Sequence, residues 1–141
     1  MHVMLCLDDN NGMLFHHRRQ SRDRALRAHM LHLCGSQPLW VNDYSAGQFA
    51  QAERARLRVD ARFLDLAGAG AFCFVEDQEI APYWAKVEDL ILFRWNRVYP
   101  ADRYFALPPE DSGWTLCRTE EFAGFSHPKI AKEVYKRCKK S

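Results

Sequence analysis

The fold is decided by residues 71–105, AFCFVEDQEIAPYWAKVEDLILFRWNRVYPADRYF. Two short apolar runs in this stretch, Phe72–Val75 and Leu90–Trp95, predict buried strands. Between them, residues Ile80–Val87 predict a short helix. A strand, a helix and a second strand in this order are typical of an α/β sheet covered by helices.

Further strands and helices are predicted on both sides of this stretch. Ser21 is expected to cap a helix that carries Asp23 in its first turn and ends at Gly35. Ser45 is expected to cap a short helix running through Phe49 and Ala52. The other predicted elements are strands at 2–7, 38–41, 57–60 and 114–118, a weak helix at 63–67, and a loop marked by Pro108-Pro109.

Composition describes an ordinary globular chain of 141 residues, and residues 1–141 are interpreted as a single domain. Hydrophobic residues make up 48% and charged residues 27%, and the net charge of +2 is too small to indicate nucleic acid by itself. No apolar run approaches the ~20 residues of a membrane span, and no secretory signal is recognised. The five scattered cysteines favour a reducing, cytoplasmic location over a disulfide framework.

In order and spacing, these segments resemble the dihydrofolate reductase fold family. The strand Asp89–Phe93, the acidic turn Pro100–Phe105 and the closing pair Trp114–Leu116 and Glu133–Arg137 carry most of the resemblance. Taken alone, the spacing of Ile130 and Val134 looks helical, whereas the resemblance implies an antiparallel closing strand. It implies a central mixed, mainly parallel sheet flanked by helices, with a C-terminal antiparallel hairpin.

The cofactor-binding motifs of that family are altered here. Where the family has a glycine pair that approaches the NADPH pyrophosphate, this chain has Glu76-Asp77, and where it has a phosphate-binding Gly-Arg turn, this chain has Asn42-Asp43. Like charges at ~4 Å repel by about 4 kcal/mol at an effective dielectric constant of ~20. We therefore expect a chain that keeps the fold and has no cofactor, with NADPH disfavoured.

The strongest candidate binding cluster is the run from Arg18 to Asp23. Arg18, Arg19 and Arg22 are suited to a phosphate or carboxylate, since guanidinium groups bind these anions through paired donors. Asp23 is the candidate catalytic residue, either as a general base or as the partner of a heterocycle's N–H groups. The alternative is a solvated basic loop in which Asp23 only stabilises the helix.

A second candidate group follows two other predicted strands. Asn42, Asp43, Glu76 and Asp77 are expected to converge near adjacent strand ends, beside the hydroxyl of Ser45. They are expected to bind a ligand or to pair with the arginine cluster. No ligand spacing indicates a metal site, and the same holds for the paired helix histidines His29 and His32.

The lead hypothesis for function is a divergent dihydrofolate-reductase-like protein that binds a small anionic or nucleotide-like ligand without NADPH. Two alternatives remain open: an NADPH-dependent reductase of a pterin or related heterocycle, and a non-catalytic interaction or nucleic-acid-binding module. Nucleic acid is the less favoured partner, because no continuous basic face with interleaved aromatic residues is evident. The sequence does not decide whether the chain is an enzyme, and it says nothing of oligomeric state.

Overall fold

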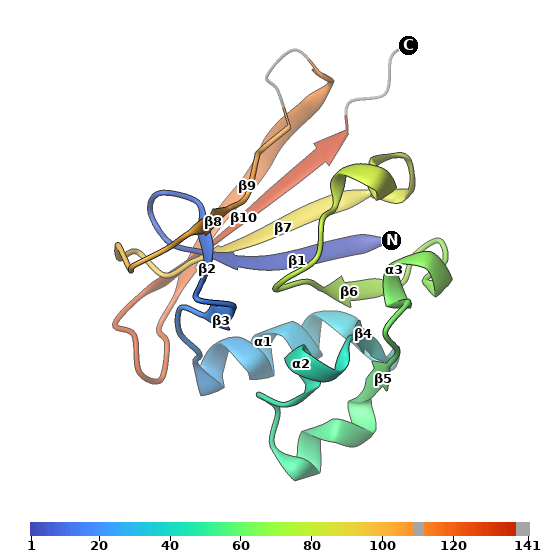
Figure 1. Ribbon diagram of the computed structural model, residues 1–141, viewed down its shortest axis with the longest axis horizontal. Coiled ribbons are helices and arrows are strands. Elements are labelled where there is room, and N and C mark those ends of the chain that lie inside the picture. The colour runs from blue at the N-terminus through green and yellow to red at the C-terminus, as the bar shows by residue number, and fades with distance from the viewer. Residues whose placement is uncertain (109–111, 138–141) are drawn as a thin grey trace.

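A seven-stranded mixed sheet runs through the molecule (Figure 1). The structure is a computed structural model that describes residues 1–108 and 112–137. The strand order is β5-β4-β6-β1-β7-β10-β9; the first five strands are mutually parallel, and β10 is antiparallel to β7 and to β9. The strands are β1 (His2–Leu7), β4 (Leu39–Val41), β5 (Leu57–Val59), β6 (Phe72–Phe74), β7 (Asp89–Arg94), β9 (Trp114–Phe122) and β10 (Ile130–Arg137).

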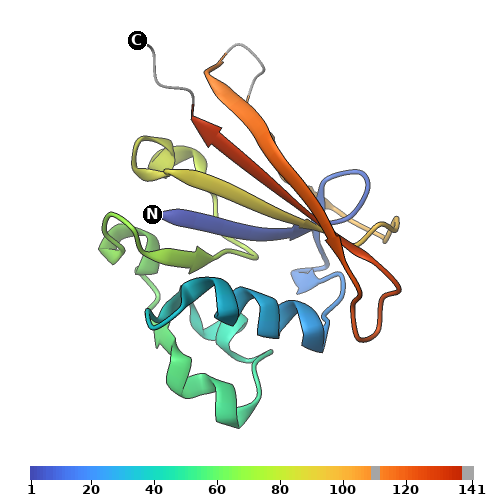
Figure 2. The same cartoon turned by 180° about the vertical axis from the view of Figure 1, so that it is seen from behind.

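Helices cover both faces of this sheet because its central strands are apolar on both sides. In β1, Val3 and Leu5 pack in one core cluster, whereas Met4 packs in the other. Helix α1 (Arg24–Cys34) lies across the second face (Figure 2). Its buried residues Leu26 and Met30 belong to the same core cluster as Met4. The shorter helices are α2 (Asp43–Ala46), α3 (Phe63–Leu66) and the 3₁₀ helices η1 (Gln51–Arg56) and η2 (Ala81–Lys86).

A second, three-stranded antiparallel sheet has the order β3-β2-β8. It contains β2 (Gly12–Phe15), β3 (Arg18–Arg19) and β8 (Arg103–Tyr104). Residues His16 and His17 form the turn between β2 and β3, and both have positive φ, 50° and 62°. Positive φ at both central residues is the geometry of a tight two-residue hairpin turn. The sequence predicted no strand here, whereas the structure has a hairpin whose second strand carries Arg18 and Arg19.

Most predicted elements are confirmed, including the choice of a strand rather than a helix for the end of the chain. The predicted cap residues of the two helices are wrong. Asp23, not Ser21, caps α1, since its carboxylate accepts hydrogen bonds from the first-turn amides; Asn42, not Ser45, caps α2, which ends at Ala46. Asp and Asn are as good caps as Ser, so local preference does not choose between neighbours. Pro109 of the expected loop, Cys138 and the final lysines lie outside the described residues.

Candidate functional site

Arg19 binds the acidic turn that follows β6. Its guanidinium donates to both carboxylate oxygens of Glu76, at 2.8 and 3.1 Å, and to the carbonyl of Tyr44 at 3.0 Å. The same guanidinium lies 4.4 Å from the centre of the Tyr44 ring, and the Tyr44 hydroxyl accepts from the Arg19 amide at 2.7 Å. Burial alone would lower the pKa of Arg19, but hydrogen bonding and attraction to Glu76 raise it. The expected pairing of the two candidate groups therefore exists, through Arg19.

The rest of the acidic turn is also paired within the protein. Asn42 donates through Nδ2 to Asp77 Oδ1 at 2.8 Å, so the structure brings Asn42, Glu76 and Asp77 together at neighbouring strand ends. Arg103 of β8 donates to the Asp77 carbonyl at 2.9 Å and to Glu79 at 3.1 Å. We call residues 76–79, together with Arg19 and Arg103, the closed acidic turn.

Asp43 and Ser45 do not join this cluster. Asp43 begins α2 and is exposed. Ser45 is buried, and its hydroxyl has no hydrogen-bond partner within the part of the chain that is described. Among the described residues, neither side chain forms a hydrogen bond or ion pair with the arginine cluster.

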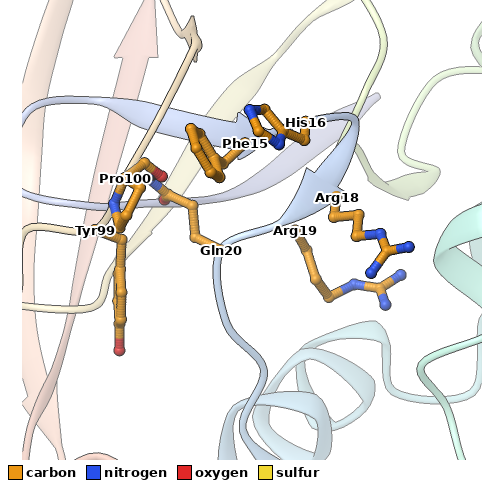
Figure 3. A pocket seen from close by; sticks show the side chains of 7 residues that line it. All are labelled: Phe15, His16, Arg18, Arg19, Gln20, Tyr99 and Pro100. Carbon is orange, nitrogen blue, oxygen red and sulfur yellow. Dashed lines mark hydrogen bonds between the residues drawn. The ribbon is translucent and has the colours of Figure 1, made fainter.

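Two neighbouring hollows meet along β3. The first, of about 480 Å³, is the tyrosine hollow; Figure 3 shows Tyr99 and the two arginines extending on either side of Gln20. It is lined by Phe15, His16, Arg18, Arg19, Gln20, Tyr99 and Pro100. The second, of about 460 Å³, is the serine hollow, lined by Arg18, Arg19, Ser21, Arg22 and Tyr44.

Arg18 and Arg22 differ from Arg19 in having no acidic partner. Across residues 1–108 and 112–137, neither guanidinium forms an ion pair with a carboxylate, and both side chains are exposed. Both line the serine hollow, and Arg18 also lines the tyrosine hollow. The hollows are therefore positively charged at their shared wall.

Asp23 is buried, with its side chain 0% exposed, and joins two distant segments. Besides capping α1, it accepts hydrogen bonds from the loop between β9 and β10, which lies beside the start of α1 (Figures 1 and 2). Gly124 permits this approach, because a Cβ there would lie 2.7 Å from Asp23 Oδ2. The donors are the amides of Ala25, Leu26, Phe125, Ser126 and His127, the Ser126 hydroxyl and His127 Nδ1.

These hydrogen bonds determine the charge of Asp23. Burial would raise the pKa of the carboxyl, but donation from the Phe125 amide, the His127 ring and the Ser126 amide outweighs burial and holds the pKa well below its usual range. With its oxygens bonded to so many donors and shielded from solvent, the carboxylate of Asp23 does not face either hollow as a ligand for a heterocycle.

His127 is the residue that sequence reasoning missed. Its ring is 4% exposed, stacks on Trp95 with centroids 4.5 Å apart, and places Nδ1 2.9 Å from Asp23 Oδ2. On the other side, Nε2 lies 3.0 Å from both the Ser21 hydroxyl and the Tyr99 hydroxyl. His127 lies in a polar loop, 106 and 104 residues from Ser21 and Asp23, so no local signal marks it and only the fold brings these residues together.

Asp8 organises the segment that carries Tyr99. The carboxylate accepts from the amides of Gly12 and Tyr99 and from the Gln20 side chain, at 2.7, 3.1 and 2.9 Å. Burial would raise the pKa of Asp8, but these hydrogen bonds, led by that from Gly12, lower it. A Cβ at Gly12 would lie 2.9 Å from Asp8 Oδ2, so the turn needs glycine for close approach.

The histidines of α1 and the buried cysteines Cys34 and Cys73 lie away from both hollows. His29 stacks on Phe122, whereas His32 is exposed. Burial raises the pKa of the Cys34 thiol to about 11 and that of Cys73 to about 12. Among the described residues, no three His, Cys, Asp or Glu side chains gather as metal ligands would.

No protein-family model and no curated protein sequence matches the chain. In the described part of the chain, every helix is too short or too polar to cross a bilayer.

Proposed function

We propose that this chain is a divergent member of the dihydrofolate-reductase-like fold family that binds a small anionic or nucleotide-like ligand without NADPH. The fold assignment is supported by the strand order, in which five parallel strands are followed by the antiparallel pair β10 and β9. It is also supported by the acidic turn directly after β6, where the resemblance places the cofactor-binding glycines.

The closed acidic turn supports the loss of NADPH. Residues that fit a pyrophosphate would offer free amides or cations, whereas here two carboxylates follow the strand and the cations beside them, Arg19 and Arg103, are already paired. A pyrophosphate would have to displace Glu76 from Arg19 and would meet its charge. The residues present do not fit the cofactor.

The observation that carries the proposed function is the pair of arginines, Arg18 and Arg22, that line the serine hollow. Arg18 and Arg22 have no carboxylate partner in the described chain, so a phosphate or carboxylate would gain both charges without breaking an internal bond. Tyr44 also lines this hollow, with the Arg19 guanidinium over its ring.

The test is thermal unfolding in the presence of pyrophosphate, nucleoside phosphates, folate-like pterins and sugar phosphates. A ligand at 100 times its dissociation constant adds about 2.7 kcal/mol of stability, which raises Tm by several degrees. We expect Arg18→Ala/Arg22→Ala to remove the shift and Arg62→Ala, on exposed α3-flanking surface, to keep it. If no anionic compound raises Tm, or if the double variant responds like the wild type, the proposal is wrong.

A further inference from the structure

Ser21, His127 and Asp23 form a continuous chain of two side-chain hydrogen bonds. The Ser21 hydroxyl lies 3.0 Å from His127 Nε2, and His127 Nδ1 lies 2.9 Å from Asp23 Oδ2. Because Asp23 is an ionised acceptor, Nδ1 carries the proton and donates to it. Nε2 of the neutral ring is then left as an acceptor for a hydroxyl proton.

The surroundings hold the imidazole in this orientation. The stacked Trp95 ring fixes the plane of His127, and both His127 and Asp23 are closed to solvent, at 4% and 0% exposure. A buried carboxylate that already accepts several amide hydrogen bonds does not rotate away from its partner. Such a carboxylate also stabilises an imidazolium when the ring gains a proton.

Ser21 is the member of this chain that meets solvent. It lies between β3 and α1 and lines the serine hollow, where Arg18 and Arg22 supply positive charge. A hydroxyl is activated when it contacts a base that is itself oriented by a third group, which is the arrangement found here. The adjacent cationic hollow supplies charge for an anionic group of the substrate.

We infer that Ser21 is a nucleophile toward acyl groups, with His127 as its general base and Asp23 as the positioning residue, and that the substrates are carboxylic esters or thioesters bearing an anionic group. The Ser21 oxygen bonds to the carbonyl carbon as its proton passes to His127 Nε2. The carbon–oxygen or carbon–sulfur bond to the leaving group then breaks, and His127 returns the proton to the leaving alcohol or thiol. A water oxygen then bonds to the acyl carbon as its proton passes to His127 Nε2. The ester bond to Ser21 breaks, the acid leaves, and His127 returns the proton to the Ser21 oxygen.

Tyr99 has a defined part in this cycle. Its hydroxyl oxygen lies 3.0 Å from His127 Nε2, on the side of the tyrosine hollow. Once the ring is an imidazolium, Nε2 is a donor and the Tyr99 oxygen accepts from it. The ion is thus hydrogen-bonded at both nitrogens while Ser21 is bonded to the acyl group.

An uncharged alkyl fluorophosphonate tests the inference on the intact chain. The Ser21 oxygen bonds to phosphorus, the phosphorus–fluorine bond breaks, and fluoride leaves while His127 takes the proton. The probe is uncharged, so labelling of Ser21 does not depend on the proposed anion binding. The labelling test and the thermal-unfolding test can therefore fail independently. Peptide mass spectrometry then compares Ser21 with the exposed Ser36 in the same molecule.

We expect Ser21 to be labelled at least ~100-fold faster than Ser36, and His127→Gln to slow Ser21 labelling by at least ~100-fold, since a general base contributes about 10²–10⁴. Ser21→Ala removes the label, and Ser36→Ala keeps it. Circular dichroism checks that each variant is folded. If His127→Gln does not fold, the wild-type comparison of Ser21 with Ser36 decides alone. Equal labelling of the two serines, or a folded His127→Gln protein that labels at the wild-type rate, overturns the inference.

Discussion

The closed acidic turn and the serine hollow use neighbouring arginines in opposite ways. Arg19 donates hydrogen bonds to the carboxylate of Glu76, which is only 7% exposed, and to a backbone carbonyl. Arg18 and Arg22 have no carboxylate partner in the described chain. The comparison shows that a local count of arginines does not measure anion-binding capacity. What matters is whether the fold has already placed a carboxylate against each one.

The largest effect is expected at Asp23, beneath the serine hollow. Asp23→Asn replaces a buried carboxylate that accepts hydrogen bonds from several donors. A hydrogen bond to a charged group contributes about 1.5–3 kcal/mol, so we expect a loss of about 3 kcal/mol in the free energy of unfolding at pH 7. Urea titration measures this loss. Asp9→Asn, an exposed neighbour of the same chemistry, is the control and should change stability by less than ~0.5 kcal/mol.

The same residue predicts a pH dependence. The pKa of Asp23 is lower in the folded state than its ordinary value of about 3.9, so its stabilising contribution is fully present above pH ~4 and is lost as the pH falls below it. Unfolding free energies from pH 6 to pH 2.5 should therefore fall more steeply for the wild type than for Asp23→Asn. Parallel profiles would contradict the hydrogen-bonded, ionised Asp23.

The next effect tests the closed acidic turn. Glu76→Gln leaves the Arg19 guanidinium partly buried without its counter-charge, and we expect a loss of about 2 kcal/mol, since breaking a fully buried pair costs about 3–5 kcal/mol. Glu79→Gln, whose carboxylate is 76% exposed, is the matched control and should be nearly neutral. Equal losses in the two variants would show that the ion pair of Arg19 adds no stability beyond that of a surface pair.

A smaller effect is expected when the acidic turn is opened. Wild-type protein should give no saturable change in NADPH fluorescence, whereas Glu76→Gly/Asp77→Gly removes both carboxylates and frees Arg19 for a phosphate. We expect the double variant to bind at least ~10-fold more tightly, about 1.4 kcal/mol. Asp60→Gly/Asp65→Gly, which removes two carboxylates elsewhere, controls for net charge. Tight NADPH binding by the wild type would instead favour the reductase alternative.

The smallest effect on stability is expected at the arginines of the serine hollow. Arg18→Ala and Arg22→Ala remove exposed side chains that have no ion-pair partner among the described residues, so each should change the free energy of unfolding by less than ~0.5 kcal/mol. Chemical unfolding without ligand measures this directly. A loss above 1 kcal/mol would mean that these arginines stabilise the hairpin and are not free to bind a ligand.

The elements that sequence reasoning predicted well are those with strong local patterns. The apolar runs at β1, β6 and β7 need burial wherever they lie, and Gly35 ends α1 with a φ of 60° that favours glycine. The hairpin of β2 and β3 was missed because its turn residues, His16 and His17, are not the Asn or Gly that usually mark such turns.

The features of the candidate site also fall into two groups, those that the sequence predicts and those that only the tertiary structure shows. The arginine-rich run and the acidic pair at the end of a strand follow from the sequence alone, because charge and continuous apolar runs are visible in the order of the residues. Only the tertiary structure decided that Arg19 is paired with Glu76, that Arg18 and Arg22 have no carboxylate partner within residues 1–108 and 112–137, and that Asp23 and Ser21 meet His127. Pairing depends on the distance between atoms far apart in the chain, which is determined by the packing of the whole sheet and not by any local preference.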